Sequence, residues 1–379
     1  MTFLSRILTL IFAAMFFSSC LMLPEKQEPP ETPHLAKKKQ LIAKQEEARA
    51  RATARKIQSI LERNGSIYSN PKITAYLQSV MNKLYPKYKG RMNVKILKFT
   101  NLNAFALANG TIYFNLGLIA RLENEAQLAT VLGHEGAHYV YKHLLKRRLK
   151  IKAATLAGSN RTTIYGYTRA LERSADRHAF MRLRKAGYDT SEAYKVFEHL
   201  LDEVTLLRVH KPGLVRLHPK LVDRITSFKK LHAKFGNKAG LLRNGHYNKR
   251  MRKVKIADLE ANLAAGNYKS VILILERPRL NKDYPKFYRY YLGEAYRLRG
   301  QSDDYSKAAE SYLQSTRNAP QFSPAYNALG IYYLKQVKLR KARQYFRQYL
   351  KLNPQGKHAA YANHYIMSID NKIRKGSSL

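Results

Sequence analysis

The pentapeptide His134-Glu135-Gly136-Ala137-His138 contains residue types that can hold a metal ion and activate water. Residues four apart lie on one face of a helix, so His134 and His138 can bind one ion from the same side. Glu135 lies beside the first ligand, within reach of a metal-bound water. Two imidazoles, a third ligand, an open position and a carboxylate base are what zinc-dependent hydrolysis requires. The alternative is a surface helix with two solvated histidines.

The third ligand must come from another segment. A third histidine six residues after His138 is absent, because a leucine occupies that position. Residues 168–186 predict a helix, and Glu172 and Asp176 lie four apart on it. We therefore expect Glu172 to ligate the metal and Asp176 to hold the far ring nitrogen of a ligating histidine. A solvated pair of carboxylates among the arginines of this helix is the alternative.

The pentapeptide falls inside a predicted helix of about residues 123–146, which begins with acidic residues and good helix formers. Gly133 and Gly136 would each weaken this helix by about 1 kcal/mol relative to alanine. We expect these small residues to allow close approach of backbone or substrate beside the metal.

A small sheet is expected next to this helix. Residues 92–99 alternate as a strand does, and residues 104–108 and 111–115 flank Asn109-Gly110, a strong hairpin signal. One edge of the sheet would face the cleft, where an extended substrate could add through main-chain hydrogen bonds. The residues expected to bind substrate there are Asn109, Gly110, Thr111 and Tyr113. A purely structural hairpin is the alternative.

These motifs resemble a known peptidase family. Glu-x-x-x-Asp downstream of His-Glu-x-x-His is similar to the gluzincin zinc metalloproteases related to HtpX, in the BepA-like periplasmic lipoprotein form with C-terminal tetratricopeptide repeats. The resemblance extends over roughly 70–230 through Asn103–Ala106, Asn109–Phe114, Gly117-Leu118, His218-Pro219 and Asp223-Arg224. It implies an α+β zincin-like metalloprotease domain, mostly helical with a small sheet. It also implies one zinc ion and substrates among misfolded or misassembled envelope proteins.

The resemblance gives two further residues a role. His218 would occupy the place of a histidine that approaches the zinc and either blocks or assists the open position. Arg224 would order a carboxylate near the site. An ordinary surface or core residue is the alternative for both. Residues 141–161 are basic where some relatives have apolar membrane segments, so we do not expect several membrane spans.

The N-terminus predicts export and lipid anchoring. Residues 1–19 have the basic start and short apolar run of a signal peptide, too short to span a membrane. Cys20, the only cysteine, looks like a bacterial lipoprotein cleavage site at which the cysteine becomes lipidated; a buried free thiol is the alternative. Leu21 is not acidic, and by resemblance to bacterial sorting signals this favours the outer membrane, facing the periplasm. With one cysteine, no intramolecular disulfide can form.

The formal net charge of the 379 residues is +43, spread along the whole chain. Such chains often bind nucleic acid, but an exported protein would rarely meet any, so nucleic acid is not an expected partner. Anionic envelope polymers and lipid headgroups are candidate partners, and a solvated basic surface is the alternative. Residues 20–62 predict a lipidated tether followed by an exposed charged helix.

The C-terminal third shows a repeat of 34 residues, which is typical of tetratricopeptide repeats. The clearest copy consists of Tyr326, Leu329, Gly330, Tyr333, Ala342, Phe346 and Pro354. An earlier copy consists of Leu292, Gly293, Tyr296, Ala308, Tyr312 and Pro320. A weaker pair of helices is expected to start near Ile256 and to turn at Ala265-Gly266-Asn267. We expect these helices to bind protein partners or substrate segments, with a purely stabilising cap as the alternative.

Together these features predict four regions: a lipoprotein signal peptide (1–19), a lipidated tether with a charged helix (20–62), a zinc metalloprotease domain (63–235) and an all-α tetratricopeptide-repeat domain (250–372). The leading hypothesis is a zinc metalloendopeptidase of the bacterial periplasm, anchored to the outer membrane, in which Glu135 activates water. Its expected partners are unfolded or misassembled envelope proteins, the membrane through the lipid anchor, and outer-membrane assembly machinery through the repeats. The alternative is a non-proteolytic assembly factor or chaperone with a closed metal site.

Overall fold

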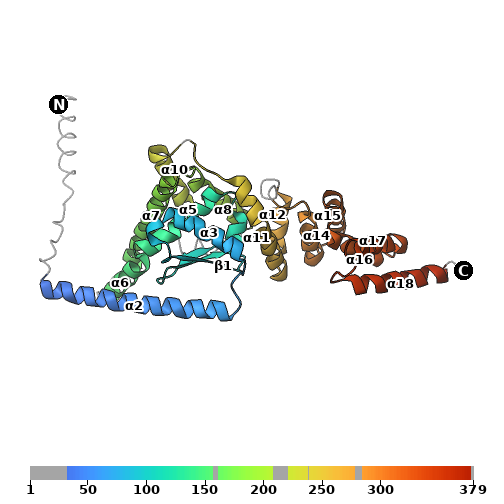
Figure 1. Ribbon diagram of the computed structural model, residues 1–379, viewed down its shortest axis with the longest axis horizontal. Helices are drawn as coiled ribbons and strands as arrows, with labels where there is room; N and C mark the ends of the chain where they lie inside the picture. Colours follow the sequence, from blue (N-terminus) through green and yellow to red (C-terminus); the bar gives the residue numbers. More distant parts are fainter. Residues whose placement is uncertain (1–31, 157–160, 208–220, 238, 278–283, 377–379) are drawn as a thin grey trace, which may run out of the picture. The chain divides into compact units, whose positions relative to one another are not determined.

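The computed structural model describes residues 32–156, 161–207, 221–237, 239–277 and 284–376 (Figure 1). The chain divides into two compact units, Met1–Ala48 and Arg49–Leu379. The expected signal peptide, Cys20 and His218 lie outside the described residues, so their roles stay predictions.

The sheet has three strands, β1 (Asn93–Leu97), β2 (Ala104–Ala106) and β3 (Thr111–Asn115). The central strand, β3, pairs in parallel with β1 and antiparallel with β2. Gly110 precedes β3 with a φ of 89°, and a Cβ there would lie 2.1 Å from the carbonyl oxygen of Arg91, so the turn requires glycine. The structure thus contains the strand and the hairpin that the sequence predicts.

Helix α5 (Glu125–Val140) is the central helix and contacts α3, α7, α8 and β2. The Asn124 side chain caps it by accepting a hydrogen bond from the backbone N–H of Gln127 at 2.8 Å. Every residue from Glu125 to Ala137 is buried. The surrounding helices are α3 (Pro71–Leu84), α4 (Leu116–Arg121), α6 (His143–Leu156), α7 (Arg161–Lys185), α8 (Glu192–Leu207) and α10 (Leu221–Phe235).

The predicted helix of 123–146 is broken in the structure. Helix α5 ends at Val140, and α6 begins at His143. Between them Lys142 has a φ of 52°, in the left-handed region that an α-helix of L-residues cannot continue through. The predicted helix of 168–186 is present as the second half of α7, and Gly187 follows it with a φ of 76°.

Helix α2 (Pro33–Arg63) is the expected charged helix, but its second half is not simply exposed. From Arg49 it belongs to the larger unit, where Ala54 packs with Leu97 and Tyr113 of the sheet. Gln58 accepts hydrogen bonds from Asn109 and Thr111, at 3.0 and 3.2 Å. The apolar face of this half of the helix therefore covers the sheet. Among the described residues, no helix combines the length and the apolar character needed to cross a membrane.

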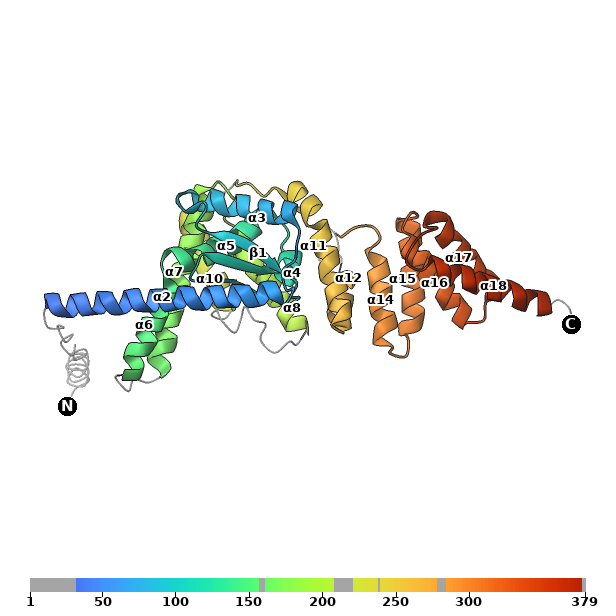
Figure 2. The same cartoon turned by 60° about the horizontal axis from the view of Figure 1, so that its bottom comes forward.

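In the C-terminal region, the described residues form helices joined by turns. Figure 2 shows its helices following one another along the chain. They are α11 (Asn244–Ala264), α12 (Tyr268–Glu276), α14 (Tyr288–Arg299), α15 (Asp304–Asn318), α16 (Ser323–Lys335), α17 (Leu339–Leu352) and α18 (Ala359–Gly376). Neighbouring helices pack on one another from α11 to α18. The overall fold class, mostly helical with a small sheet, is confirmed.

Buried charges connect the first of these helices to the region around α5. Arg121, the last residue of α4, donates to Glu203 of α8 at 2.9 Å and to Asp258 of α11 at 2.6 Å, and all three residues are buried. Tyr247 of α11 donates to the carbonyl oxygen of Ile119 in α4 at 3.0 Å. The first half of α11 is therefore part of the same hydrophobic core as α5 and the sheet.

Two glycines allow the C-terminal helices to approach closely. A Cβ on Gly293 would lie 2.4 Å from the ring of Tyr312, and a Cβ on Gly330 would lie 2.5 Å from the ring of Phe346. The two contacts join α14 to α15 and α16 to α17 at corresponding positions of the two predicted repeats. Both rings are almost completely buried, so neither can move aside easily.

We expect Gly330→Ala to lower the free energy of unfolding, because overpacking costs about 1–3 kcal/mol and outweighs the gain in helix propensity. Gly245→Ala in α11 is the matched control, since no atom lies within 4 Å of its Cβ. This control should leave stability unchanged or raise it by up to about 1 kcal/mol. Urea denaturation followed by circular dichroism measures both. Equal stability of the two variants would contradict the packing argument.

Candidate metal centre

Three side chains converge between α5 and α7 as possible metal ligands. His134 and His138 of α5 and Glu172 of α7 place their donor atoms within 4.8 Å of one another. The two Nε2 atoms are 3.0 Å apart, and the Glu172 carboxylate lies 3.4 Å from His134 Nε2 and 3.6 Å from His138 Nε2. A tetrahedral site with bonds of about 2.0–2.1 Å separates its ligand atoms by about 3.3–3.4 Å. The donors of this chain therefore fit a small tetrahedral ion such as zinc.

Close packing of the two helices brings the third donor to the other two. A Cβ on Gly133 would lie 3.3 Å from Ala179 Cα, so small residues on both helices set their separation. Gly136 has a different neighbour, since a Cβ there would lie 2.4 Å from the ring of Tyr85. The hydroxyl of Tyr85 donates to the carbonyl oxygen of Gly133 at 2.6 Å. Of the expected close approach of backbone or substrate, Gly133 thus allows that of the α7 backbone, whereas Gly136 makes room for the ring of Tyr85.

A buried carboxylate and a buried guanidinium hold His134. His134 Nδ1 lies 2.8 Å from Asp176 Oδ1, so the imidazole donates there while its Nε2 faces the other donors. Arg224 of α10 donates to both Asp176 oxygens, at 2.5 and 3.1 Å, and its guanidinium lies over the ring of Phe197. Arg224 also lies 3.0 Å from His134 Nδ1, and because both are donors, Asp176 is their shared acceptor.

The two candidate histidine ligands differ in their surroundings. His134 is buried, whereas the side chain of His138 retains 16% exposure. His138 Nδ1 lies 3.2 Å from Nδ1 of a further buried histidine, His143, at the start of α6. No sequence pattern singles out His143, because five residues along a continuous helix would turn it about 140° away from His138.

Before a metal binds, the site holds a proton. Burial lowers the pKa of His134 and Arg224 lowers it further, but the hydrogen bonds to Asp176 and Glu172 outweigh both and raise this pKa to about 9. Burial raises the pKa of Asp176, yet Arg224 and His134 hold it below its usual value. His134 is thus protonated beside an ionised Asp176 at neutral pH, and a metal must displace that proton.

The residues predicted to bind substrate lie in the central strand of the sheet and in the turn before it. Thr111 and Tyr113 lie in β3, which is paired on both sides and is therefore not an edge of the sheet. Both are buried, and Asn109 and Gly110 form the turn before them. The strand that contacts α5 and has one unpaired side is β2. Glu135 is almost completely buried on α5, between the two histidine ligands in sequence.

Comparison with known proteins identifies a related family. Residues 69–158 and 150–232 match peptidase family M48. The chain is 30% identical to the protein of Vibrio cholerae that carries the name beta-barrel assembly-enhancing protease. The match extends over 197 residues, which are 44% of this chain and 40% of that protein. The chain is also 23% identical to the beta-barrel assembly-enhancing protease of Escherichia coli. That match extends over 196 residues, which are 44% of this chain and 40% of the relative.

A mitochondrial relative matches as well. Metalloendopeptidase OMA1 of Saccharomyces cerevisiae is 25% identical over 173 residues, which is 40% of this chain and 50% of that protein. The matched part of the chain thus spans between 40% and 50% of the length of these relatives. The family resemblance predicted from the two metal-site helices is confirmed.

Zinc binding at about pH 7.5 is expected to release one proton from His134, because its pKa of about 9 lies above this pH and only neutral imidazole can ligate. Affinity should accordingly fall about tenfold for each pH unit below 9. Titration calorimetry in buffers of different ionisation enthalpy counts the protons.

Asp176→Asn removes the carboxylate that raises the pKa of His134, so this variant should release fewer protons than the wild type. Asp202→Asn changes an exposed carboxylate on α8 and is the matched control. It should release as many protons on zinc binding as the wild type. Equal proton release by Asp176→Asn and the wild type would show that Asp176 does not set the protonation of His134.

Proposed function

We propose that this chain is a zinc-dependent endopeptidase, because residues 69–158 and 150–232 match peptidase family M48. The observation that carries the proposal is the buried donor set of His134, His138 and Glu172, two nitrogens and one carboxylate at separations that suit tetrahedral zinc. A site with three protein ligands leaves a fourth position for water or substrate, as in catalytic zinc sites.

When bound, zinc would lower the pKa of a water in the fourth position to about 7 and polarise the scissile carbonyl. Glu135 would take the proton of the attacking water and pass it to the leaving amine. Asp176 and Arg224 would keep His134 oriented, with its Nε2 toward the metal. From the sequence alone, we propose that His218 approaches the open position and blocks or assists it.

The names of the relatives support a more specific substrate class. Two of them are named for the enhancement of β-barrel assembly, so we propose that the substrates are misfolded or misassembled envelope proteins. We also propose that Cys20 is lipidated and anchors the chain to the outer membrane, facing the periplasm. This placement rests on the N-terminal sequence.

We propose further that the C-terminal helices are tetratricopeptide repeats. The corresponding contacts of Gly293 with Tyr312 and of Gly330 with Phe346 support this assignment, because small residues at helix crossings opposite aromatic residues are what the repeat pattern requires. The repeats would recruit substrate segments or outer-membrane assembly partners. A non-proteolytic assembly factor would have the same repeats but no use for the base at Glu135.

Glu135→Gln should retain about one zinc per chain and lose at least about 10²-fold in the rate of casein cleavage, because the amide cannot accept the proton of water. Metal analysis and cleavage of fluorescent casein measure the two quantities. Glu198→Gln on α8, which removes a carboxylate at a partly exposed ion pair with Lys229, is the matched control and should cleave at the wild-type rate. Wild-type cleavage by Glu135→Gln would refute the mechanism and favour the assembly factor.

A further inference from the structure

His143 is buried beside the metal centre without being one of its three donors. Its Nδ1 lies 3.2 Å from Nδ1 of His138, the ring atom on the side opposite the donor set. The two rings are 5.1 Å apart and meet edge to face, with an interplanar angle of 84°. His143 is 2% exposed, so solvent does not compete for this contact.

The arrangement fixes which nitrogen holds each proton. His138 must present the lone pair of Nε2 to a metal, so its one proton resides on Nδ1. Nδ1 of His143 can then only accept that hydrogen bond, which leaves the proton of His143 on Nε2. A protonated His143 would set two N–H groups against each other. With a metal on His138 Nε2, the contact would thus join two neutral imidazoles in opposite tautomers.

We propose that His143 is a positioning residue, which accepts a hydrogen bond from His138 Nδ1–H and holds His138 Nε2 toward the metal. This inference rests on the proposed function of the site. Ligating histidines generally donate their second N–H to a fixed acceptor, which sets the tautomer and the ring orientation. Asp176 is this acceptor for His134, and His143 is the corresponding acceptor for His138.

The break between α5 and α6 is what makes this contact possible. In a continuous helix, a residue five positions along lies about 140° around the axis, so His143 would point away from His138. Lys142 instead adopts a φ of 52°, a left-handed conformation that is unfavourable for a residue with a Cβ. The turn redirects the chain so that the first residue of α6 lies against the ring of His138. Strain of this kind at a site is consistent with a functional demand on the backbone.

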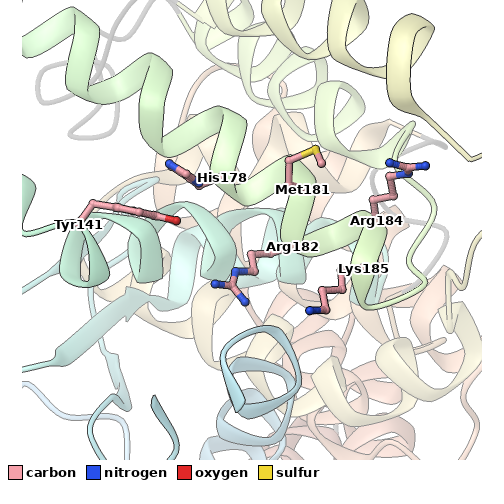
Figure 3. A pocket seen from close by; sticks show the side chains of 6 residues that line it. All are labelled: Tyr141, His178, Met181, Arg182, Arg184 and Lys185. Atoms are coloured by element: carbon pink, nitrogen blue, oxygen red, sulfur yellow. The ribbon is translucent and has the colours of Figure 1, made fainter. Parts of the chain in front are cut away.

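An aromatic contact secures the turn from the side of α7. The ring of Tyr141 stacks on His178 with centroids 3.8 Å apart and an interplanar angle of 21°. Figure 3 shows the two side by side in the wall of a surface pocket whose other walls are largely basic side chains of α7. The ring of Tyr141 also lies 6.0 Å from that of His143, at 26°. Helix α7 thus supplies Glu172 and also fixes the turn that presents His143.

The test compares zinc affinity among variants of the full chain. His143→Leu keeps the volume and removes the acceptor, and should raise the zinc Kd by about 10–100-fold, the loss typical of removing such a partner. His143→Asn places an oxygen where Nδ1 was, and should stay within about threefold of the wild type. The variant His246→Leu changes an exposed histidine of α11 and should bind zinc with the wild-type Kd. The visible spectrum of the Co²⁺-loaded protein should change in His143→Leu alone.

A wild-type Kd and Co²⁺ spectrum in His143→Leu would overturn the inference while leaving the proposed function intact. A wild-type chain that binds no zinc would overturn the proposed function itself. If circular dichroism shows that His143→Leu is unfolded, His143→Gln takes its place, because its oxygen falls near Nε2 and not near Nδ1. Weak binding by His143→Gln beside tight binding by His143→Asn supports the role of His143. Equal zinc affinity of His143→Gln and His143→Asn would overturn the proposed role of His143.

Discussion

The close approach of α5 and α7 is the constraint on which the metal centre depends. Two of the three donors lie on α5 and the third on α7, and Gly133 against Ala179 sets the separation of the two helices. Glu172 reaches both imidazoles only at this separation, with oxygens at 3.4 and 3.6 Å from the two Nε2 atoms. A larger side chain at position 133 would move the carboxylate away from both histidines at once, because packed helices shift as rigid units.

Three of the helices that follow α5 contribute side chains to the centre, and they are α6, α7 and α10. Helix α6 begins with His143, the acceptor for His138, while α7 carries Glu172 and Asp176, and α10 contributes Arg224. The two ligating histidines are held differently as a result. His134 faces an ionised carboxylate with its own guanidinium partner, so it is basic and binds a proton tightly before the metal arrives. His138 faces a neutral imidazole, which orients its ring without adding a charge to the site.

The convergence of these side chains was predictable because their spacing follows helix geometry. His134 with His138, and Glu172 with Asp176, repeat every four residues, so a single face of each helix had to hold them. Contacts between distant segments were not visible in the same way. Nothing local showed that Tyr85 fills the space at Gly136, or that α2 covers β3 and makes Thr111 and Tyr113 interior residues. The left-handed backbone at Lys142 also has no sequence signal, since lysine rarely adopts it, and this break hid His143.

The buried charges around Arg121 bear on where the fold around the metal centre ends. Arg121 follows the sheet directly, through α4, and its partners Glu203 and Asp258 come from α8 and α11. Removing one member of such a buried set leaves an uncompensated charge, at a cost of about 3–5 kcal/mol. The sequence predicts a boundary between residues 235 and 250, but a chain cut there would lose Asp258 and leave Arg121 buried with one partner fewer. The first half of α11 therefore belongs to the fold that holds the metal centre, because it contributes Asp258 and part of the same core.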